Sequence, residues 1–120
     1  MTGRAWQRLQ RRQDFLGVAA SGVKKATPGF VLQARRTSRP DLRVGFTASR
    51  KVGIAVMRNR AKRRLRAAVD RITPTIVLTG WDLVVVARQE AVTRDFAAMA
   101  GELARAVATV TKNDGTRRHD

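Results

Sequence analysis

The side chains best suited to chemistry in this sequence are cations crowded into one segment. Residues 50–66 carry eight lysine or arginine side chains and no acidic one. Positive charges at this density repel one another unless a polyanion neutralises them, so the segment is typical of a nucleic-acid contact. Because the segment holds no acid for pairs at i, i+4 spacing, a merely solvated charged face is the less favoured interpretation. The eight cations are Arg50, Lys51, Arg58, Arg60, Lys62, Arg63, Arg64 and Arg66.

Groups that could catalyse a reaction are scarce. The one histidine of the chain, His119, is its penultimate residue, and there is no cysteine. The sequence contains neither a GxxxxGK(S/T) nor a GxGxxG motif for phosphate binding. Since a protein nuclease usually needs an acid–base pair or a carboxylate metal cluster, the sequence predicts a protein that binds a polyanion and does not cleave it.

Composition agrees with a single folded domain that binds an anionic partner. The chain has 120 residues, a net charge of +16 and 43% hydrophobic residues. That hydrophobic content is too high for a disordered basic tail, and the length suffices for one domain with a modest core. No apolar run approaches the ~20 residues of a membrane span, and a chain without cysteine suits a reducing compartment. We therefore expect a cytoplasmic protein, with no membrane partner, that binds RNA or DNA.

Hydrophobic spacing places most of these cations on one helix. Apolar residues recur at three- and four-residue steps over residues 56–72, which predicts an amphipathic helix that Pro74 ends. Since the apolar stripe docks this helix on a core, most of its cationic surface must face outward. The stripe consists of Met57, Ala61, Leu65, Ala68, Val69 and Ile72.

Strands are predicted in the segments before and after the basic helix. Side chains alternate in character over residues 30–36 and 42–49, and we expect these two runs to form neighbouring antiparallel strands. The apolar run within residues 80–88 does not alternate, which indicates a strand that is buried on both faces at the centre of the sheet. A further short strand is expected near residues 22–26.

Helices are also expected near both ends of the chain. The first covers residues 10–21, and the last begins after an N-cap at Thr93 and ends at about Thr111. The residues beyond the last helix are polar and charged, which is typical of a disordered terminus. The predicted division is a basic N-terminal arm at residues 1–9, an RNA-binding domain at residues 10–111 and a disordered tail at residues 112–120.

Part of this pattern resembles a known family. The segment RVGFTASRKVGIAVMRNRAKRRLR is similar to the signature of the bacterial ribonuclease P protein component. RLQRRQDF, FVLQAR and GWDLVVVAR occur in the family's order, so the resemblance extends over roughly residues 8–110. It implies a single α+β domain in the order α-β-β-β-α-β-α, with a four-stranded sheet packed with helices. It also implies a left-handed β-α-β crossover, which the general handedness rule would not predict.

The resemblance implies a subunit that assists a catalytic RNA in removing the 5′ leader from precursor tRNA. The implied partners are ribonuclease P RNA and precursor tRNA, with Mg²⁺ bound mainly by the RNA subunit and no catalytic residue on the protein, which is expected to be a monomer when alone. Matching positions imply contacts with the RNA subunit from Ser49, Arg50, Lys51, Arg58, Asn59, Arg60, Lys62, Arg63 and Arg66. They imply a cleft for the single-stranded leader that contains Phe15, Val31, Gln33, Arg35 and Arg43.

Three positions depart from the family pattern. Ala19 stands where members often carry an aromatic residue, and Gln33 stands where they often carry tyrosine. Both changes reduce the area available for stacking on bases, so the leader would depend more on cations such as Arg35 and Arg43. Ile54 stands where members often carry asparagine, and it leaves the Arg-Asn-Arg motif of the helix intact.

Other classes of protein remain open on the residues alone. A ribosomal protein or ribosome-assembly factor would have a similar charge, size and fold class, and co-purification with ribosomal subunits would favour it. A protein nuclease is disfavoured because the acid–base groups are missing. A DNA-compacting protein would bind duplex DNA as tightly as RNA.

Overall fold

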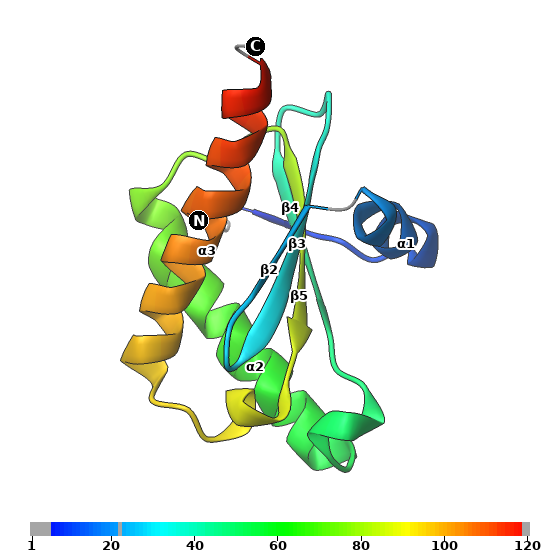
Figure 1. Cartoon of the computed structure of the whole chain (residues 1–120). Helices are drawn as coiled ribbons and strands as arrows, with labels where there is room; N and C mark the ends of the chain where they lie inside the picture. The colour runs from blue at the N-terminus through cyan, green and yellow to red at the C-terminus, as the bar shows by residue number, and fades with distance from the viewer. Residues whose placement is uncertain (1–5, 22, 119–120) are drawn as a thin grey trace, which may run out of the picture.

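A mixed sheet separates one helix from two others. The computed structural model describes residues 6–21 and 23–118. Helix α1 (Arg12–Ala20) lies on one face of the sheet, whereas α2 (Ala55–Ile72) and α3 (Phe96–Arg118) cover the opposite face, as Figure 1 shows. The sheet is thus covered on both faces, which is what the apolar strand predicted at its centre requires.

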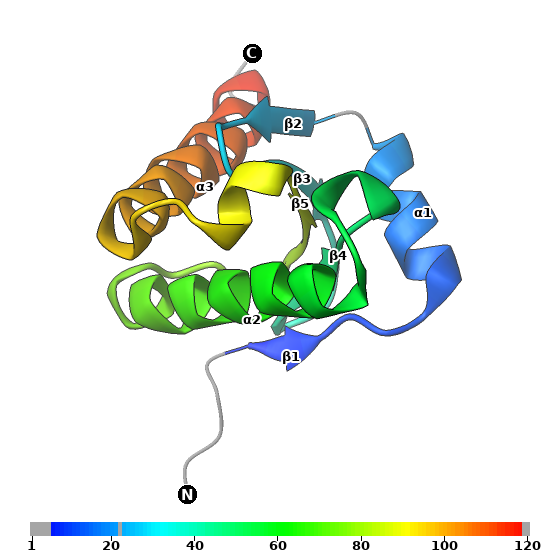
Figure 2. The same ribbon diagram turned by 90° about the horizontal axis from the view of Figure 1, so that it is seen from below.

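The sheet has five strands in the order β1-β4-β5-β3-β2. Figure 2 shows β1 at the edge beside α2 and β2 at the other edge beside α3. The strand expected near residues 22–26 is confirmed as β2, and the pairing of β1 with β4 raises the strand count from the expected four to five. The strands are β1 (Gln7–Arg8), β2 (Val23–Ala26), β3 (Phe30–Arg36), β4 (Leu42–Thr47) and β5 (Trp81–Ala87).

The expectation that β3 and β4 are neighbours is wrong, because β5 lies between them. Leu83 of β5 pairs with Ala34 of antiparallel β3 on one side and with Val44 of parallel β4 on the other. Val84 and Val85 are buried on opposite faces of β5. The central position, which the sequence predicted, covers the apolar side chains on both faces of this strand. Strands β4 and β5 with α2 form the expected parallel β-α-β unit, and its left-handed sense stays a prediction.

The main core lies between the sheet and the pair α2 and α3. The apolar stripe of α2 is confirmed from Ala61 to Ile72, where each of its members is buried. Met57, the first residue assigned to the stripe, is the exception and remains 41% exposed. It lies in the first turn of α2, beside Gly53 and not over the sheet. The helix therefore docks through its middle and C-terminal turns and presents its first turn to solvent.

The ends of α3 differ from the expected ones. Asp95 caps the helix, because its Oδ2 atom accepts a hydrogen bond of 3.0 Å from the backbone N–H of Ala98. Thr93, the predicted cap, instead follows the short helix η3 (Gln89–Val92). At the other end the helix continues to Arg118, so the disorder predicted from residue 112 onward is not seen in the described residues. No proline interrupts this stretch.

The predicted N-terminal arm also differs, since residues 6–9 belong to the domain. Trp6 is buried, contacts Phe46 edge-on and donates a hydrogen bond of 2.9 Å from Nε1 to Asp70 Oδ1 on α2. Leu9 is buried in a second, smaller core beneath α1 with Val18 and Val84. Trp6 and Leu9 are large apolar residues among the arginines of this segment. They indicate that the segment is buried in the domain, which a count of its charges does not reveal. Residues 1–5 of the predicted arm lie outside the described residues.

A buried charge cluster fixes α1 to the sheet. The side chain of Asp82 on β5 is fully buried and accepts hydrogen bonds from Arg35 Nη2 at 2.9 Å and from Arg43 Nε and Nη2 at 2.9 and 2.6 Å. Asp14 of α1 joins the cluster through a contact of 3.5 Å with Arg43 Nη1. Burial by itself would raise the pKa of the Asp82 carboxyl, but the hydrogen bonds from the two guanidinium groups lower it below its ordinary value.

Replacing Asp82 with asparagine should lower the free energy of unfolding by roughly 3 kcal/mol, because two arginines lose their buried anionic partner. Since the pKa of Asp82 is lowered in the folded state, its stabilisation is present above the ordinary aspartate pKa of about 3.9 and is lost as the pH falls through the folded value. Urea unfolding of the wild type and of Asp82→Asn, across the acid range and at pH 7, measures both effects.

The matched control is Asp41→Asn, which breaks an ion pair with Arg39 at the surface of the β3–β4 loop. It should change the stability much less, because water screens that pair. If Asp82→Asn is as stable as the control and loses stability in acid as steeply as the wild type, the charge cluster does not anchor α1.

Candidate nucleic-acid interface

One flank of α2 holds its arginines against neutral backbone groups. Arg64 donates hydrogen bonds of 2.8 Å to the Ala91 carbonyl and 2.6 Å to the Arg94 carbonyl, and Arg60 donates one of 3.4 Å to the Val92 carbonyl. A carbonyl oxygen orients a guanidinium group without cancelling its charge. These arginines are therefore held in place and still present a full positive charge to a partner.

The opposite flank and the outer face of α2 carry the less tethered cations. Arg63 and Asn59 are exposed, while Lys62 and Arg66 are half-buried beside the apolar stripe. Within the described part of the chain, neither Lys62 nor Arg63 forms an ion pair with an acidic side chain. Flexible cations without local anions are suited to the phosphates of a nucleic acid.

The turn before α2 adds two further cations. It forms the short helix η1 (Arg50–Val52), in which Ser49 Oγ accepts a hydrogen bond of 3.2 Å from the backbone N–H of Lys51. Val52 is buried and fixes the turn to the domain, so Arg50 and Lys51 remain exposed next to the start of α2. All the residues predicted to contact an RNA subunit thus lie on α2 or on the turn that leads into it.

The other face of the sheet is ordered in three rows of side chains. Because directly paired residues of adjacent strands point to the same side, the strand register places each row across β3, β5 and β4. The first row is the charge cluster, the second lies under α1, and the third lies beyond it. In that order the rows are Arg35, Asp82 and Arg43; Gln33, Val84 and Gly45; and Val31, Val86 and Thr47.

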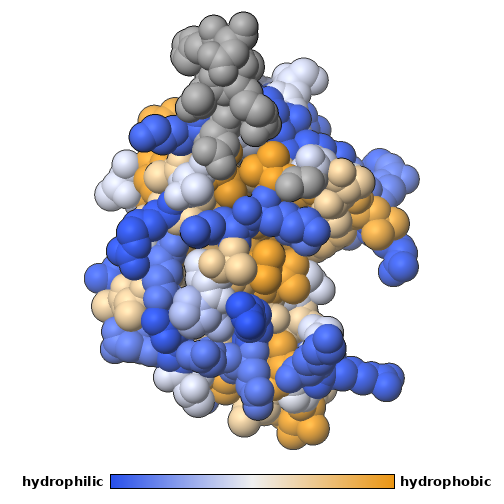
Figure 3. Space-filling view, in the orientation of Figure 1, coloured by the Kyte–Doolittle hydropathy of each residue, from blue (hydrophilic) through white to orange (hydrophobic). Residues whose placement is uncertain are grey.

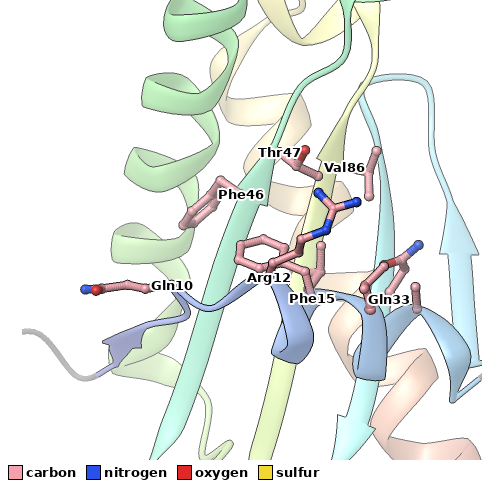
Figure 4. A pocket seen from close by; sticks show the side chains of 10 residues that line it. Gln10, Arg12, Phe15, Gln33, Phe46, Thr47 and Val86 are labelled. Carbon is pink, nitrogen blue, oxygen red and sulfur yellow. The ribbon is translucent and has the colours of Figure 1, made fainter.

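A cleft of about 480 Å³ lies between α1 and the second and third rows. Figure 3 shows a notch between α1 and the segment after β4, with hydrophobic surface inside it and hydrophilic side chains along its lower rim. Phe15 and Gln33, which the resemblance assigns to a leader cleft, both line this one. In Figure 4, Arg12 extends from α1 over the cleft on the same side as Thr47 and Val86, which also line it.

The remaining residues predicted for this cleft occupy other positions. Val31 belongs to the third row but is not among the lining residues. Arg35 and Arg43 lie in the charge cluster with Asp82, on the side of α1 away from the cleft, with side chains only 31% and 18% exposed. Two carboxylates largely neutralise these two arginines. The positive charge that they present to an incoming phosphate is therefore small.

Sequence reasoning missed two kinds of residue here. The first is Arg12, whose spacing from Phe15 and Ala19 places all three on one face of a helix, so the period of α1 could have revealed it. The second is Asp82, an acid within an otherwise apolar strand. A buried carboxylate requires charged or hydrogen-bonding partners, so an acid within an apolar strand indicates that cations lie beside it without showing which ones.

Phe15 is held by close packing on a glycine. Gly45 of β4 is buried under the ring, and a Cβ atom at this position would lie 2.6 Å from Phe15 Cζ and 3.1 Å from Leu9 Cβ. Any larger residue would push the ring, and α1 with it, away from the sheet. The absence of a side chain at residue 45 therefore sets the depth of the cleft.

The described residues also limit what the chain contributes to chemistry. Among them, no group of three or more histidine, cysteine, aspartate or glutamate side chains gathers as a metal site would require. No described helix is long and apolar enough to cross a membrane. His119, the one histidine, lies outside the described residues. The described features offer two surfaces for binding, the cationic face of α2 with its preceding turn and the cleft beside α1.

The family model of ribonuclease P matches residues 4–111 of the sequence. The chain belongs to the ribonuclease P protein family. This family is the protein component of ribonuclease P, a ribonucleoprotein endoribonuclease, so an RNA is the partner with which the chain works. The family match spans both α2 and the cleft residues on α1, β3 and β4.

Individual ribonuclease P proteins agree with this assignment. The protein component of Paramagnetospirillum magneticum is 46% identical over 108 residues, which cover 86% of this chain and 81% of the relative. That of Gluconacetobacter diazotrophicus is 48% identical over 99 residues, which cover 82% and 85%. Among solved structures, the RNase P protein of Thermotoga maritima superposes with a TM-score of 0.70 at 27% identity, covering 88% of this chain and 96% of that one. The α+β single-domain fold expected from the resemblance is confirmed.

Substituting Gly45 with alanine should lower the free energy of unfolding by about 1–3 kcal/mol, because the new methyl group overlaps the Phe15 ring. Urea unfolding measures the loss, and a crystal structure of the variant should show the ring displaced into the cleft. Gly101→Ala in α3 is the control, since its Cβ meets only Arg105 Nη1 at 3.5 Å. That change should stabilise the helix by about 0.5–1 kcal/mol. Equal stability of the two variants would contradict the packing argument.

Proposed function

We propose that this chain joins two RNA molecules: α2 and the η1 turn bind the RNA subunit of ribonuclease P, and the cleft under α1 binds the single-stranded 5′ leader of precursor tRNA. The observation that carries this proposal is the separation of the two surfaces. The cationic helix covers one face of the sheet, and the cleft opens on the other. A single rigid domain can therefore contact both polyanions at once.

The chemistry of the cleft suits an unpaired strand. Phe15 offers a half-buried aromatic face, and the apolar Val84 and Val86 form the floor. A base removed from a helix can stack on such a surface, while Arg12 at the rim is placed to pair with a phosphate. Bases within a duplex are already stacked on each other, so the cleft favours the leader over the paired stem of the tRNA.

The role of α2 is electrostatic. The RNA subunit and the precursor tRNA repel each other, and a domain of net charge +16 that contacts both lowers that repulsion. Magnesium ions, held mainly by the RNA subunit, supply the metal-ion chemistry of phosphodiester hydrolysis. The chain reduces the magnesium concentration needed to bring the two RNAs together. When it is alone the chain is a monomer, and it works in the cytoplasm, where precursor tRNA is made.

The decisive experiment is cleavage of precursor tRNA by the cognate RNA subunit at low magnesium, with and without the chain. Strong activation by the chain, together with no cleavage by the chain alone, supports the proposal. The rival function is that of a ribosomal or ribosome-assembly protein. Absence of activation, combined with co-purification with ribosomal subunits, would overturn the proposal in favour of that rival.

Alanine substitution of Lys62 or Arg63 should weaken binding to the RNA subunit roughly tenfold and raise the magnesium concentration needed for half-maximal cleavage, because a charged contact to phosphate is lost. These two positions test the helix more cleanly than Arg60, whose guanidinium also contacts the Val92 carbonyl. Titration of magnesium at fixed RNA and protein concentrations measures the effect. Arg105→Ala on α3, which removes an exposed cation elsewhere, should leave the titration curve unchanged; an equal shift would mean that only total charge matters.

Replacing Gln33 with tyrosine should increase affinity for the leader. Gln33 lines the cleft opposite Ala19, so a ring there would add stacking area where little exists. A stacked base contributes about 1–3 kcal/mol, and we expect at least a fivefold lower dissociation constant for precursor tRNA that carries a leader. Mature tRNA, which lacks the leader, is the matched control ligand and should bind the variant and the wild type equally. A gain for both ligands would show that the cleft does not hold the leader.

A further inference from the structure

Three large apolar side chains are exposed together where α2 begins. Ile54 is 71% exposed, Val56 is 70% exposed and Met57 is 41% exposed. We refer to these three residues as the Ile54 patch. Isolated apolar residues on a surface need no explanation, but three large ones exposed within four successive positions at one end of a helix are of the kind that marks an interaction site.

The patch occupies a position where a polar residue would stabilise the helix. Ile54 is the N-cap residue of α2, and no side chain there accepts a hydrogen bond from the first turn. Serine, threonine, aspartate or asparagine at this position would satisfy one of the free N–H groups. The protein therefore carries an exposed apolar side chain at a position where its own fold favours a polar one. The apolar side chain is therefore better explained by contact with a partner than by the stability of the helix.

The surroundings of the patch identify the kind of partner. Next to Met57 lies a hollow of about 310 Å³ that Val52 and Val92 also line. Arg50 and Lys51 precede the patch, and Arg58 directly follows it in α2. The acid at the edge of the hollow, Glu90, is paired with Arg94. The Ile54 patch is thus an apolar spot within a cationic surface.

This combination fits a nucleobase between its phosphates better than a protein surface. A base presents a flat apolar face, and the phosphates on either side of it are anionic. Isoleucine and methionine are among the side chains that proteins place against unstacked bases. A second copy of this chain would bring another +16 charge to the same surface, so charge disfavours self-association there.

We propose that Ile54, Val56 and Met57 pack against the face of an unpaired base of the RNA subunit while Arg50, Lys51 and Arg58 bind the neighbouring phosphates. The inference rests on the proposed function, since it assumes that the α2 surface faces the RNA subunit. It adds a contact that is not electrostatic to an interface otherwise built from charge.

Salt dependence separates this contact from a phosphate contact. Binding a phosphate releases counterions, so losing one such contact reduces the slope of log affinity against log salt by roughly 0.7–0.9. An apolar contact with a base releases none. The double variant Ile54→Ala/Val56→Ala should therefore weaken binding of the RNA subunit by about five- to tenfold at every salt concentration, with the slope unchanged. Lys51→Ala should reduce the slope.

The matched control is Val77→Ala. Val77 is 89% exposed beyond the other end of α2, so its truncation removes a similar apolar side chain without touching the patch, and affinity should not change. The double variant is not expected to unfold, because alanine at either position is at least as compatible with a helix start as isoleucine or valine. Circular dichroism of the full chain verifies this.

Chemical probing of unpaired bases in the complex gives a second readout. One base that the wild type protects should become reactive with the double variant and stay protected with Val77→Ala. Unchanged affinity, a changed salt slope or an unchanged protection pattern would each overturn the base contact, as would a loss of self-association in place of RNA affinity. A wild-type chain that fails to bind the RNA subunit at all would instead refute the proposed function.

Discussion

The fully buried carboxylate of Asp82 is the constraint on which the geometry of this protein depends. It lies on the central strand and holds the guanidinium groups of Arg35 and Arg43, one from each neighbouring strand. Asp14 extends the cluster to α1, so the position of that helix over the sheet is determined by charge pairing as well as by the packing of Phe15 on Gly45. The cleft lies between α1, placed in this way, and the part of the sheet formed by Gln33, Val84 and Val86.

The charge cluster and α2 keep their arginines in different electrostatic states. Around Asp82 the guanidinium groups are matched by carboxylates and serve the fold. On α2 they contact backbone carbonyls, as Arg64 does at Ala91 and Arg94, or extend into solvent. The arginines of the charge cluster therefore have less charge available to a polyanion than those of α2 and the turn before it.

Much of this arrangement could be predicted from the sequence where one element contains its own evidence. The period of the apolar residues defined α2, and the unbroken apolar run of β5 indicated its central place. Pairing between distant strands left no such trace, because the alternation in β3 and β4 is the same whether they adjoin each other or β5. For the same reason the roles of Arg35 and Arg43 were hidden, since each depends on an acid far away in the sequence.

The central position of β5 has a consequence for the order of synthesis. Strands β3 and β4 acquire their shared neighbour only after the whole of α2 has been made, and the Arg35–Asp82 contact joins residues 47 positions apart. A nascent chain that ends before β5 would expose the inner edges of both strands and all the cations of α2 while it is still attached to the ribosome, which consists largely of RNA. Folding of this domain is thus late, depends on non-local contacts, and begins beside a competing polyanion.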